Sequence, residues 1–381
     1  GLIPAYVNPG RFLPSYLVAY LFWVGIALGC ISLTLLHHLA GGTWGLVLRR
    51  PMEAGALTLL PLAVLFLPLA LGLPALYPWA RWTPEFIRTH EAIRSKAHYL
   101  NTGFFLGRTA GYFVVWFVLA YLLNRWSTQE DRAEDRRPTD RLQTLGGPGL
   151  GIVFLTATFA SIDWMMTLEP DWYSTLYGAM TIVGWGLLTF AAMTLIVAFL
   201  AEDEPMAGVA TPQVFHDLGN LMLAFVMLWA YLAFSHFLII WSGNLTEEIP
   251  WYLRRTRGGW QYVVLALMVF HFFLPFCFLL FRENKRRART LVIGAGLIIA
   301  MHLVNLTWLI IPARFDRLDA RPYLPWLELV LIPVAALGIG GIWLAFFLRQ
   351  LKARPLVPRH ADLEPASDHA AHRAAQPAGG L

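Results

Sequence analysis

Two opposite charges lie inside long apolar stretches of this sequence and are the first residues that could do chemistry. Arg108 stands in the stretch 101–124, and Asp163 stands in the stretch 146–168. Because an unpaired charge is costly in apolar surroundings, such side chains face the protein interior and find partners there. We therefore expect Arg108 and Asp163 to form an ion pair. The pair either only fixes helix packing or tunes the pKa of the carboxyl group for proton handling.

An acidic turn follows the same stretch. Glu169 and Asp171 flank Pro170 shortly after Asp163. We expect these two carboxylates to end the apolar stretch in water. A turn of this kind is suited to releasing a proton or to receiving a positively charged partner.

Protonatable and hydroxyl side chains recur in the later apolar stretches, at positions that suit a proton relay. The candidate residues are His216, Asp217, Tyr231, Ser235, His236, His271 and His302. Imidazole titrates near neutral pH, and ionisable groups inside membrane helices commonly line ion pathways. Two alternatives remain open. In one, His216 and Asp217 only begin a helix, with Asp217 near the positive end of the helix dipole. In the other, His271 and His302 bind haem.

The composition defines the elements that must position these residues. The chain has 381 residues, of which 57% are hydrophobic and 14% are charged. An average soluble domain is about 25% charged, so this chain has too little charge to cover a soluble surface. Its apolar residues form blocks of about 20 or more, long enough for helices to cross a bilayer. The sequence predicts an all-α, polytopic integral membrane protein.

Nine membrane spans are predicted from the apolar blocks. Pro61, Pro68 and Pro74 interrupt the second of them. Membrane helices tolerate such residues where neighbours satisfy the freed backbone groups. The predicted spans are 14–39, 54–77, 101–124, 146–168, 174–200, 217–241, 259–281, 289–312 and 325–348.

The net charge of +5 is concentrated in the short connections between spans. We interpret these charges as topology signals, not as a nucleic-acid surface. One side, which carries Arg49 and Arg50, the segments 125–141 and 282–289 and the C-terminal tail, has the larger share of Lys and Arg. The positive-inside rule makes it cytoplasmic. The loops of the opposite side are rich in Trp and Tyr, which form either an interfacial belt or a docking surface.

Several kinds of site are not predicted. Cys30 and Cys277 lie in separate apolar blocks without a C-x-x-C-H motif, so we expect no iron–sulfur cluster or c-type haem bound by this chain. A phosphate-binding glycine loop, a nucleophile elbow and zinc-type His/Cys spacing are not found either. We expect no resident metal or cofactor and no soluble catalytic chemistry.

Four blocks of the sequence suggest a family. They are "YLFWVGIALGC" (20–30), "FFLGRTAGYF" (104–113), "SIDWMMTLEPDWYSTLYG" (161–178) and "HDLGNLMLAFVMLWAYLAFSHFLIIWSGNLTEEIPWYLRR" (216–255). With them the chain resembles the F subunits of bacterial alternative complex III. These belong to the membrane-subunit family of polysulfide reductase and the nitrite-reductase D protein. The similarity extends to about residue 350.

The resemblance implies two four-helix transmembrane bundles, residues 1–168 and 169–312, and a final transmembrane helix in 313–350. Residues 351–381 would be a mobile cytoplasmic tail, in agreement with their lack of apolar periodicity. The family has a further N-terminal span that has no counterpart among these 381 residues. The expected location is the bacterial inner membrane, crossed several times.

The resemblance also implies a function in respiratory electron transfer. Such a complex takes electrons from a quinol and passes them to an acceptor such as a cytochrome c or a high-potential iron–sulfur protein. The expected partners are lipids, a homologous quinol-binding membrane subunit, an iron–sulfur subunit, c-type cytochrome subunits and a haem-copper terminal oxidase. The quinol, the clusters and the haems would be held by those partners. This subunit would contribute proton translocation, through polar residues including Arg108, Asp163, Glu169 and the histidines, or support of the membrane arm.

Two alternatives come from other classes of protein. In the first, the chain is purely a structural anchor for peripheral redox subunits. In the second, it is a self-standing secondary transporter. Paired discontinuous helices at corresponding places in two halves would favour the transporter. The sequence does not show them clearly.

Overall fold

The computed structural model describes residues 9–89, 91–131, 137–314 and 325–357. Within these ranges the chain is helical, and nine helices are long and apolar enough to cross a membrane. These spans are 10–40, 44–71, 102–130, 138–168, 177–200, 212–243, 260–280, 288–313 and 326–352. For the described residues, the prediction of an all-α chain with nine helices long and apolar enough to cross a membrane is confirmed.

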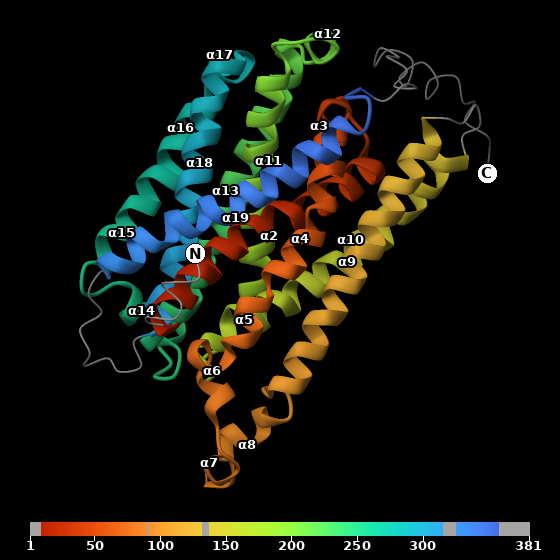
Figure 1. Ribbon diagram of the computed structural model, residues 1–381. Helices are drawn as coiled ribbons and strands as arrows, with labels where there is room; N and C mark the ends of the chain where they lie inside the picture. Colours follow the sequence, from red (N-terminus) through yellow and green to blue (C-terminus); the bar gives the residue numbers. More distant parts are fainter. Residues whose placement is uncertain (1–8, 90, 132–136, 315–324, 358–381) are drawn as a thin grey trace, which may run out of the picture.

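Figure 1 shows the long helices running side by side between two ends of the molecule. We name these the α17 end and the α14 end. The long helices are α2 (Pro9–Ala40), α3 (Trp44–Leu57), α9 (Thr102–Glu130), α10 (Arg137–Trp164), α11 (Tyr177–Leu200), α13 (Pro212–Gly243), α18 (Ala288–Ile310) and α19 (Trp326–Lys352). The seventh span is divided into α15 (Trp260–Ala266), a π-helix η3 (Leu267–Phe273) and α16 (Leu274–Leu280).

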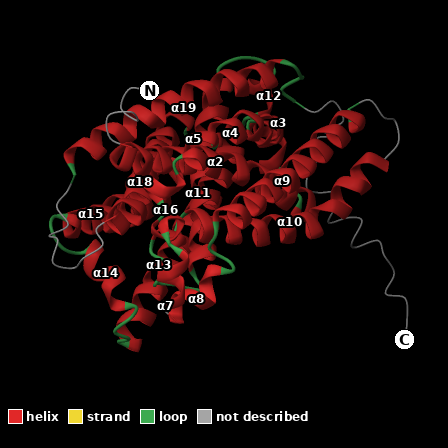
Figure 2. Ribbon diagram, turned by 60° about the horizontal axis from the view of Figure 1, so that its bottom comes forward, coloured by secondary structure: helices red, strands yellow, loops and turns green. Residues whose placement is uncertain are grey.

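Short elements complete the chain. Near the α14 end they are η1 (Pro78–Arg81), α7 (Pro84–Thr89), α8 (Glu91–Ala97), η2 (Met166–Leu168), α14 (Ile249–Arg255) and η4 (Ile311–Arg314). Near the α17 end they are α12 (Met206–Val209) and α17 (Arg282–Arg286). Figure 2 shows α7 and α8 together, with α14 close to the start of α15. The tail predicted from residue 351 lies mostly in 358–381, outside the described residues.

Helix α2 is the centre of the helix packing. It contacts α3, α10, α11 and α19, and nearly all of its side chains are buried. On one side the Trp23 indole donates a hydrogen bond of 2.8 Å to the Ala336 carbonyl of α19. A methyl group on Gly340 would lie 2.4 Å from the Trp23 ring, so only glycine permits this approach of α19. The first span of the sequence is thus enclosed by later ones.

The later helices pack around α11. This helix contacts α2 on one side and α13 and α18 on the other, while η3 and α16 pack against α18 and α13. Helix α19 returns to α2 and α3. The division at residues 168 and 312 stays a prediction.

The second span begins about ten residues earlier than predicted, at Trp44 and not at residue 54. Arg49 and Arg50 were expected in a connecting loop, but both lie buried within α3. Both guanidinium groups form ion pairs there with acidic side chains of α3 and α9. Neither charge is therefore buried without a partner, which would be strongly destabilising. The helix therefore includes two residues that a hydropathy window excludes.

The prolines break the second half of this span as expected. Three short helices follow α3, namely α4 (Leu59–Leu65), α5 (Leu67–Leu71) and α6 (Leu73–Leu76). Pro68 and Pro74 lie in the first turns of α5 and α6. A proline at that position sacrifices no intrahelical hydrogen bond, so it starts each new segment.

Candidate functional site

Arg108 and Asp163 form the predicted ion pair between α9 and α10. The Arg108 Nε lies 2.8 Å from Asp163 Oδ2, and Nη2 lies 2.9 Å from Oδ1. This arrangement is bidentate, the strongest geometry for a guanidinium and a carboxylate. Asp163 is fully buried. The expectation that the two charges turn toward each other is confirmed.

Aromatic residues complete the surroundings of this pair. The Tyr112 hydroxyl donates a 2.7 Å hydrogen bond to Asp163 Oδ2. The Arg108 guanidinium lies 3.7 Å from the ring centre of Tyr99 and donates to the Tyr99 carbonyl, and it lies 4.3 Å from the ring centre of Phe104. Two aromatic rings therefore contact the cation, and both oxygens of the anion are hydrogen-bonded.

Two tyrosines outside the spans respond to the buried carboxylate. Burial, assisted by the negative charge of Asp163, raises the pKa of Tyr99 to about 12. The same two causes raise the pKa of Tyr77 well above its ordinary value, and the Tyr77 hydroxyl donates to the Trp164 carbonyl at 2.9 Å. Both phenols therefore remain neutral at physiological pH.

Glu169 does not end the span in water, and that expectation is wrong. The residue is 7% exposed, and its carboxylate pairs with Arg254 and, at 2.6 Å, with Arg255 Nη2. These two arginines come from α14, far along the chain, and they replace water around the carboxylate. Only Asp171 is exposed. Of the two acids in this turn, Asp171 thus lies on the surface, whereas Glu169 is buried and links the turn to α14.

Arg255 connects Glu169 to the rest of the α14 end. It is 1% exposed and donates to the carbonyls of Trp251 and Leu309, at 3.0 and 2.8 Å. Its guanidinium lies 3.9 Å from the ring centre of Trp251, which itself stacks on Trp172. Part of the aromatic content predicted for an interface or docking surface is therefore interior packing.

A second buried charge cluster was missed by sequence reasoning. Glu53 accepts hydrogen bonds from Arg49 at 3.1 Å and from Arg50 at 2.6 Å, and it is 2% exposed. The arginines also pair with Glu130 and Asp131 at the end of α9. The sequence signal was an acid at i+3 and i+4 from two arginines, a spacing that pairs side chains on one helix.

The cluster extends to the end of α19. Arg354 donates to the Asn124 side chain at 2.9 Å and lies 3.6 Å from Glu53. Ser127 accepts from both Arg49 and Arg50 and donates to Glu53. Because α3, α9 and the end of α19 all contribute, this cluster ties the three helices together.

His216 and Asp217 lie in the first turns of α13, near the α17 end. The Asn220 amide lies 3.3 Å from His216 Nδ1, and Gln213 donates to Asp217 at 3.0 Å. The Lys285 ammonium donates to the Asn220 side chain at 2.6 Å, and burial lowers the pKa of Lys285. The structure places these residues together at the helix start.

Tyr231, Ser235 and His236 lie farther along α13. Tyr231 is 66% exposed on the outer surface of the helix, whereas Ser235 is half-buried and His236 is buried. His236 Nδ1 lies 2.8 Å from the Tyr252 hydroxyl. His216 is about four helical turns from Tyr231, so the predicted relay residues form two separate groups on this helix.

His271 and His302 lie close together, as expected for neighbouring spans at equal depth. Their ring centres are 5.9 Å apart, and the His271 ring meets the Trp229 ring edge to face at 4.3 Å. His271 belongs to the π-helix η3, a type of segment frequent at functional sites. Among the described residues, neither ring nitrogen of either histidine has a hydrogen-bond partner.

Within the described residues, no group of three or more His, Cys, Asp or Glu side chains is arranged to hold a metal ion. Cys30 and Cys277 are both free thiols, far apart in the sequence. His271 and His302 therefore form a pair of imidazoles that packs against an aromatic ring.

No family model and no curated protein matches the sequence of this chain.

Proposed function

We propose that the chain is a membrane subunit of a quinol:electron-acceptor oxidoreductase of the alternative complex III type. It anchors the peripheral iron–sulfur and c-type cytochrome subunits, next to a homologous quinol-binding membrane subunit, in a bacterial inner membrane with its C-terminus in the cytoplasm. Two four-helix bundles and a final helix would form its membrane part. The proposal rests on the four sequence blocks 20–30, 104–113, 161–178 and 216–255.

The Arg108–Asp163–Tyr112 site is the observation that supports a part in proton translocation. A carboxylate buried in a span is retained at a cost, and such residues mark ion pathways in many membrane proteins. Here a phenol and a guanidinium both donate hydrogen bonds to the carboxylate. A proton would reach it only when the pair with Arg108 opens.

A purely anchoring role is the second candidate, and the same site favours it in another way. Both carboxylate oxygens are hydrogen-bonded, and Glu169 is likewise held by two arginines. Closed networks of this kind rigidify a protein and specify one packing. A rigid membrane arm is what docked peripheral subunits would need.

The first experiment identifies the assembly. An affinity tag on this chain should isolate, from native membranes, a complex that contains c-type haem and reduces an acceptor with electrons from a quinol. Mass spectrometry and the reduced-minus-oxidised spectrum report its composition. If the chain purifies alone and shows no quinol oxidation in any membrane fraction, the proposed function is wrong. Solute uptake by liposomes that hold this chain alone would favour a transporter.

The second experiment separates proton translocation from anchoring. Asp163→Asn removes the buried charge, and Asp140→Asn is the matched control because Asp140 is an exposed acid near the other end of the same helix. In proteoliposomes, a proton path through Asp163 predicts that only Asp163→Asn lowers the number of protons moved per electron. If that ratio stays at the wild-type value in an assembled complex, the anchoring role is retained and the proton path is rejected.

A further inference from the structure

The connection between the seventh and eighth spans is short and strongly basic. Only residues 281–287 lie between α16 and α18, and they include the helix α17. We call residues 281–289 the α17 turn. It contains one acid, Glu283, and five cations, which are Arg282, Lys285, Arg286, Arg287 and Arg289. The four arginines are exposed, whereas the lysine is buried.

Most of this positive charge is available to a ligand. The acid of the turn lies 3.8 Å from Arg287, but both side chains are mostly exposed, and surface pairs of this kind are weak. Among the described residues, Arg282, Arg286 and Arg289 have no ion-pair partner. The acidic stretch 202–204 precedes α12, which is separate from α17 in Figure 1.

Lys285 fixes the α17 turn against α13. Its ammonium donates a 2.6 Å hydrogen bond to the Asn220 side chain. A methyl group on Gly219 would lie 2.5 Å from Lys285 Cγ, so glycine permits this close approach. The Asn284 amide donates to the Phe278 carbonyl of α16 at 3.0 Å. Because the turn is held from two sides, binding would not require its backbone to become ordered.

Large apolar side chains adjoin the arginines on the surface of the protein. Phe281 directly precedes Arg282, and Phe281, Leu280 and Ile293 are all more than half exposed. Two of these side chains belong to helices long and apolar enough to cross a membrane, so their outer surfaces would face hydrocarbon. Since the connection is short, its arginines would stand at the level of the lipid headgroups.

The arginine side chains indicate which chemical group is bound. A guanidinium carries a planar fork of N–H donors that matches two oxygens of one phosphate group. Arg282 and Arg286 are four positions apart in α17, a spacing that makes side chains neighbours on one helix face. Two neighbouring guanidinium groups suit a ligand that has two phosphates.

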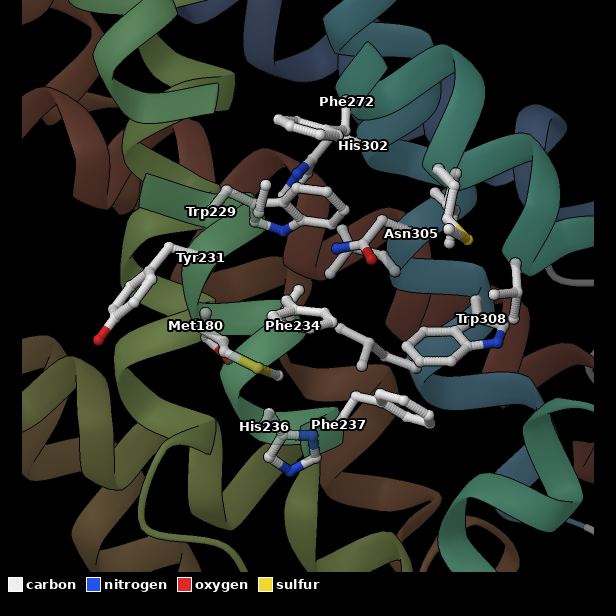
Figure 3. Close-up of a pocket in the computed structure, with 18 of the residues that line it drawn as sticks. Met180, Trp229, Tyr231, Phe234, His236, Phe237, Phe272, His302, Asn305 and Trp308 are labelled. Atoms are coloured by element: carbon white, nitrogen blue, oxygen red, sulfur yellow. The ribbon is translucent and has the colours of Figure 1, made fainter. Parts of the chain in front are cut away.

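The apolar cavity beside His302 does not offer this chemistry. It has a volume of about 760 Å³ and lies between α13, η3 and α18. Figure 3 shows His302 and Asn305 extending from α18 toward Trp229 and the middle of this cavity. Among the described residues that line it there is no Asp, Glu, Lys or Arg. A phosphate would therefore lose its hydration there without gaining an opposite charge, which is strongly unfavourable.

We propose that the α17 turn is a binding site for an anionic phospholipid with two phosphate groups, of the cardiolipin type. Arg282 and Arg286 bind the phosphates, and the acyl chains lie against Phe281 and the apolar side chains beside it. An acidic protein surface would meet the arginines but not the membrane-facing side chains, so the contiguous apolar surface favours a lipid. The site goes beyond the proposed function, which assigns no ligand to this chain.

The test uses the full-length chain in detergent micelles, with bound lipid counted by native mass spectrometry as cardiolipin is added. Phosphatidylethanolamine, which has no net charge, and phosphatidylglycerol, which has one phosphate, are the control lipids. Cardiolipin should bind at least about tenfold more tightly than phosphatidylethanolamine and about threefold more tightly than phosphatidylglycerol. Its affinity should fall with rising salt, because exposed charges are screened.

Variants locate the binding. Arg282→Gln with Arg286→Gln should weaken cardiolipin binding at least about tenfold, since each basic residue near an anionic lipid surface contributes about fivefold. Arg349→Gln with Lys352→Gln is the matched control. It removes two exposed cations from the last turn of α19, which also reaches the α17 end in Figure 1. The control should leave the affinity within about twofold.

Each possible result decides the matter. Equal weakening in the two double variants would mean that overall charge attracts the lipid, and the proposal would be overturned. Unchanged binding in the α17 variant, or equal affinities for cardiolipin and phosphatidylglycerol, would also overturn it. So would absence of cardiolipin binding to the wild-type chain, which would fit an acidic partner surface at this turn.

The wild-type comparison of lipids decides even if circular dichroism shows that a variant does not fold. Because these measurements need no electron transfer, they can fail while the oxidoreductase assignment stands, and the reverse.

Discussion

The Arg108–Asp163 site and the His302 cavity are opposite solutions to placing polar groups inside an apolar protein. At the first, each oxygen and the guanidinium have partners within 3.0 Å. At the second, both nitrogens of a buried imidazole have no partner among the described residues, beside a cavity of about 760 Å³. The polar groups of the first site are paired within the chain, whereas those of the imidazole are not paired by any described residue.

The difference teaches which kind of polar residue stabilises the fold. A fully paired charge cannot be removed without leaving its partner buried and alone. An unpaired neutral group contributes little to the folded state and can be replaced by an apolar group at small cost. Variants at the two regions should therefore change stability by different amounts, and the largest effects should lie at the paired charges.

The largest effect is expected for Arg108→Leu. This change leaves the fully buried Asp163 carboxylate without its counter-ion, which should lower the free energy of unfolding by about 3–5 kcal/mol. Unfolding in mixed micelles of rising denaturing-detergent content measures it. The double variant Arg108→Leu with Asp163→Leu should regain most of the loss. If the single variant loses less than about 1 kcal/mol, the ion pair does not stabilise the fold as its burial and bidentate geometry indicate.

Glu53→Leu should have a similar but slightly smaller effect, about 2–4 kcal/mol. It removes the shared partner of Arg49 and Arg50, but Glu130 and Asp131 remain to compensate part of their charge. The same unfolding assay measures it, with Glu283→Leu as the control because that acid is exposed on α17. A larger loss in the control than in Glu53→Leu would contradict the role assigned to the cluster.

Tyr112→Phe removes one hydrogen bond to the carboxylate and no charge. Hydrogen bonds to charged groups contribute about 1.5–3 kcal/mol, and we expect a loss at the lower end because Arg108 still holds both oxygens. Tyr121→Phe on the exposed face of the same helix should change stability by less than about 0.5 kcal/mol. Equal effects of the two changes would show that the bond to Asp163 contributes nothing.

The smallest effect on stability is expected for His302→Leu. It should change the free energy of unfolding by less than about 1 kcal/mol, since no hydrogen bond of the described residues is lost. The same unfolding assay measures this change. A loss of several kcal/mol would mean that a partner within the chain satisfies this imidazole.

Much of the fold could be predicted because hydrophobic length alone identifies a spanning helix. The limits of the spans agree with the prediction within five residues, except at both limits of the second span, the end of the third and the start of the fourth. At the starts of the second and fourth and at the end of the third, charged or polar residues are included in the helix. Arg49 and Arg50 show why. Their burial depends on acids in α9, and a hydropathy window does not include such distant partners.

The candidate site was predictable to the same extent. Arg108 and Asp163 could be paired from sequence because each needs an opposite charge in an apolar surrounding. Glu169 could not be placed, because the residues that bury it, Arg254 and Arg255, come from a loop more than eighty positions later. The cavity beside His302 was invisible, since an empty space depends on how three helices pack and not on any one of them.

The enclosed position of α2 has a consequence for biogenesis. The ribosome makes this helix before the other described spans, yet Trp23 finds its acceptor only when Ala336 of α19 has been made. During synthesis, one face of α2 must therefore be sheltered by the insertion machinery or by lipid until α19 arrives. A chain shortened before residue 326 should accordingly insert all its earlier spans and still be cleared by quality-control proteases.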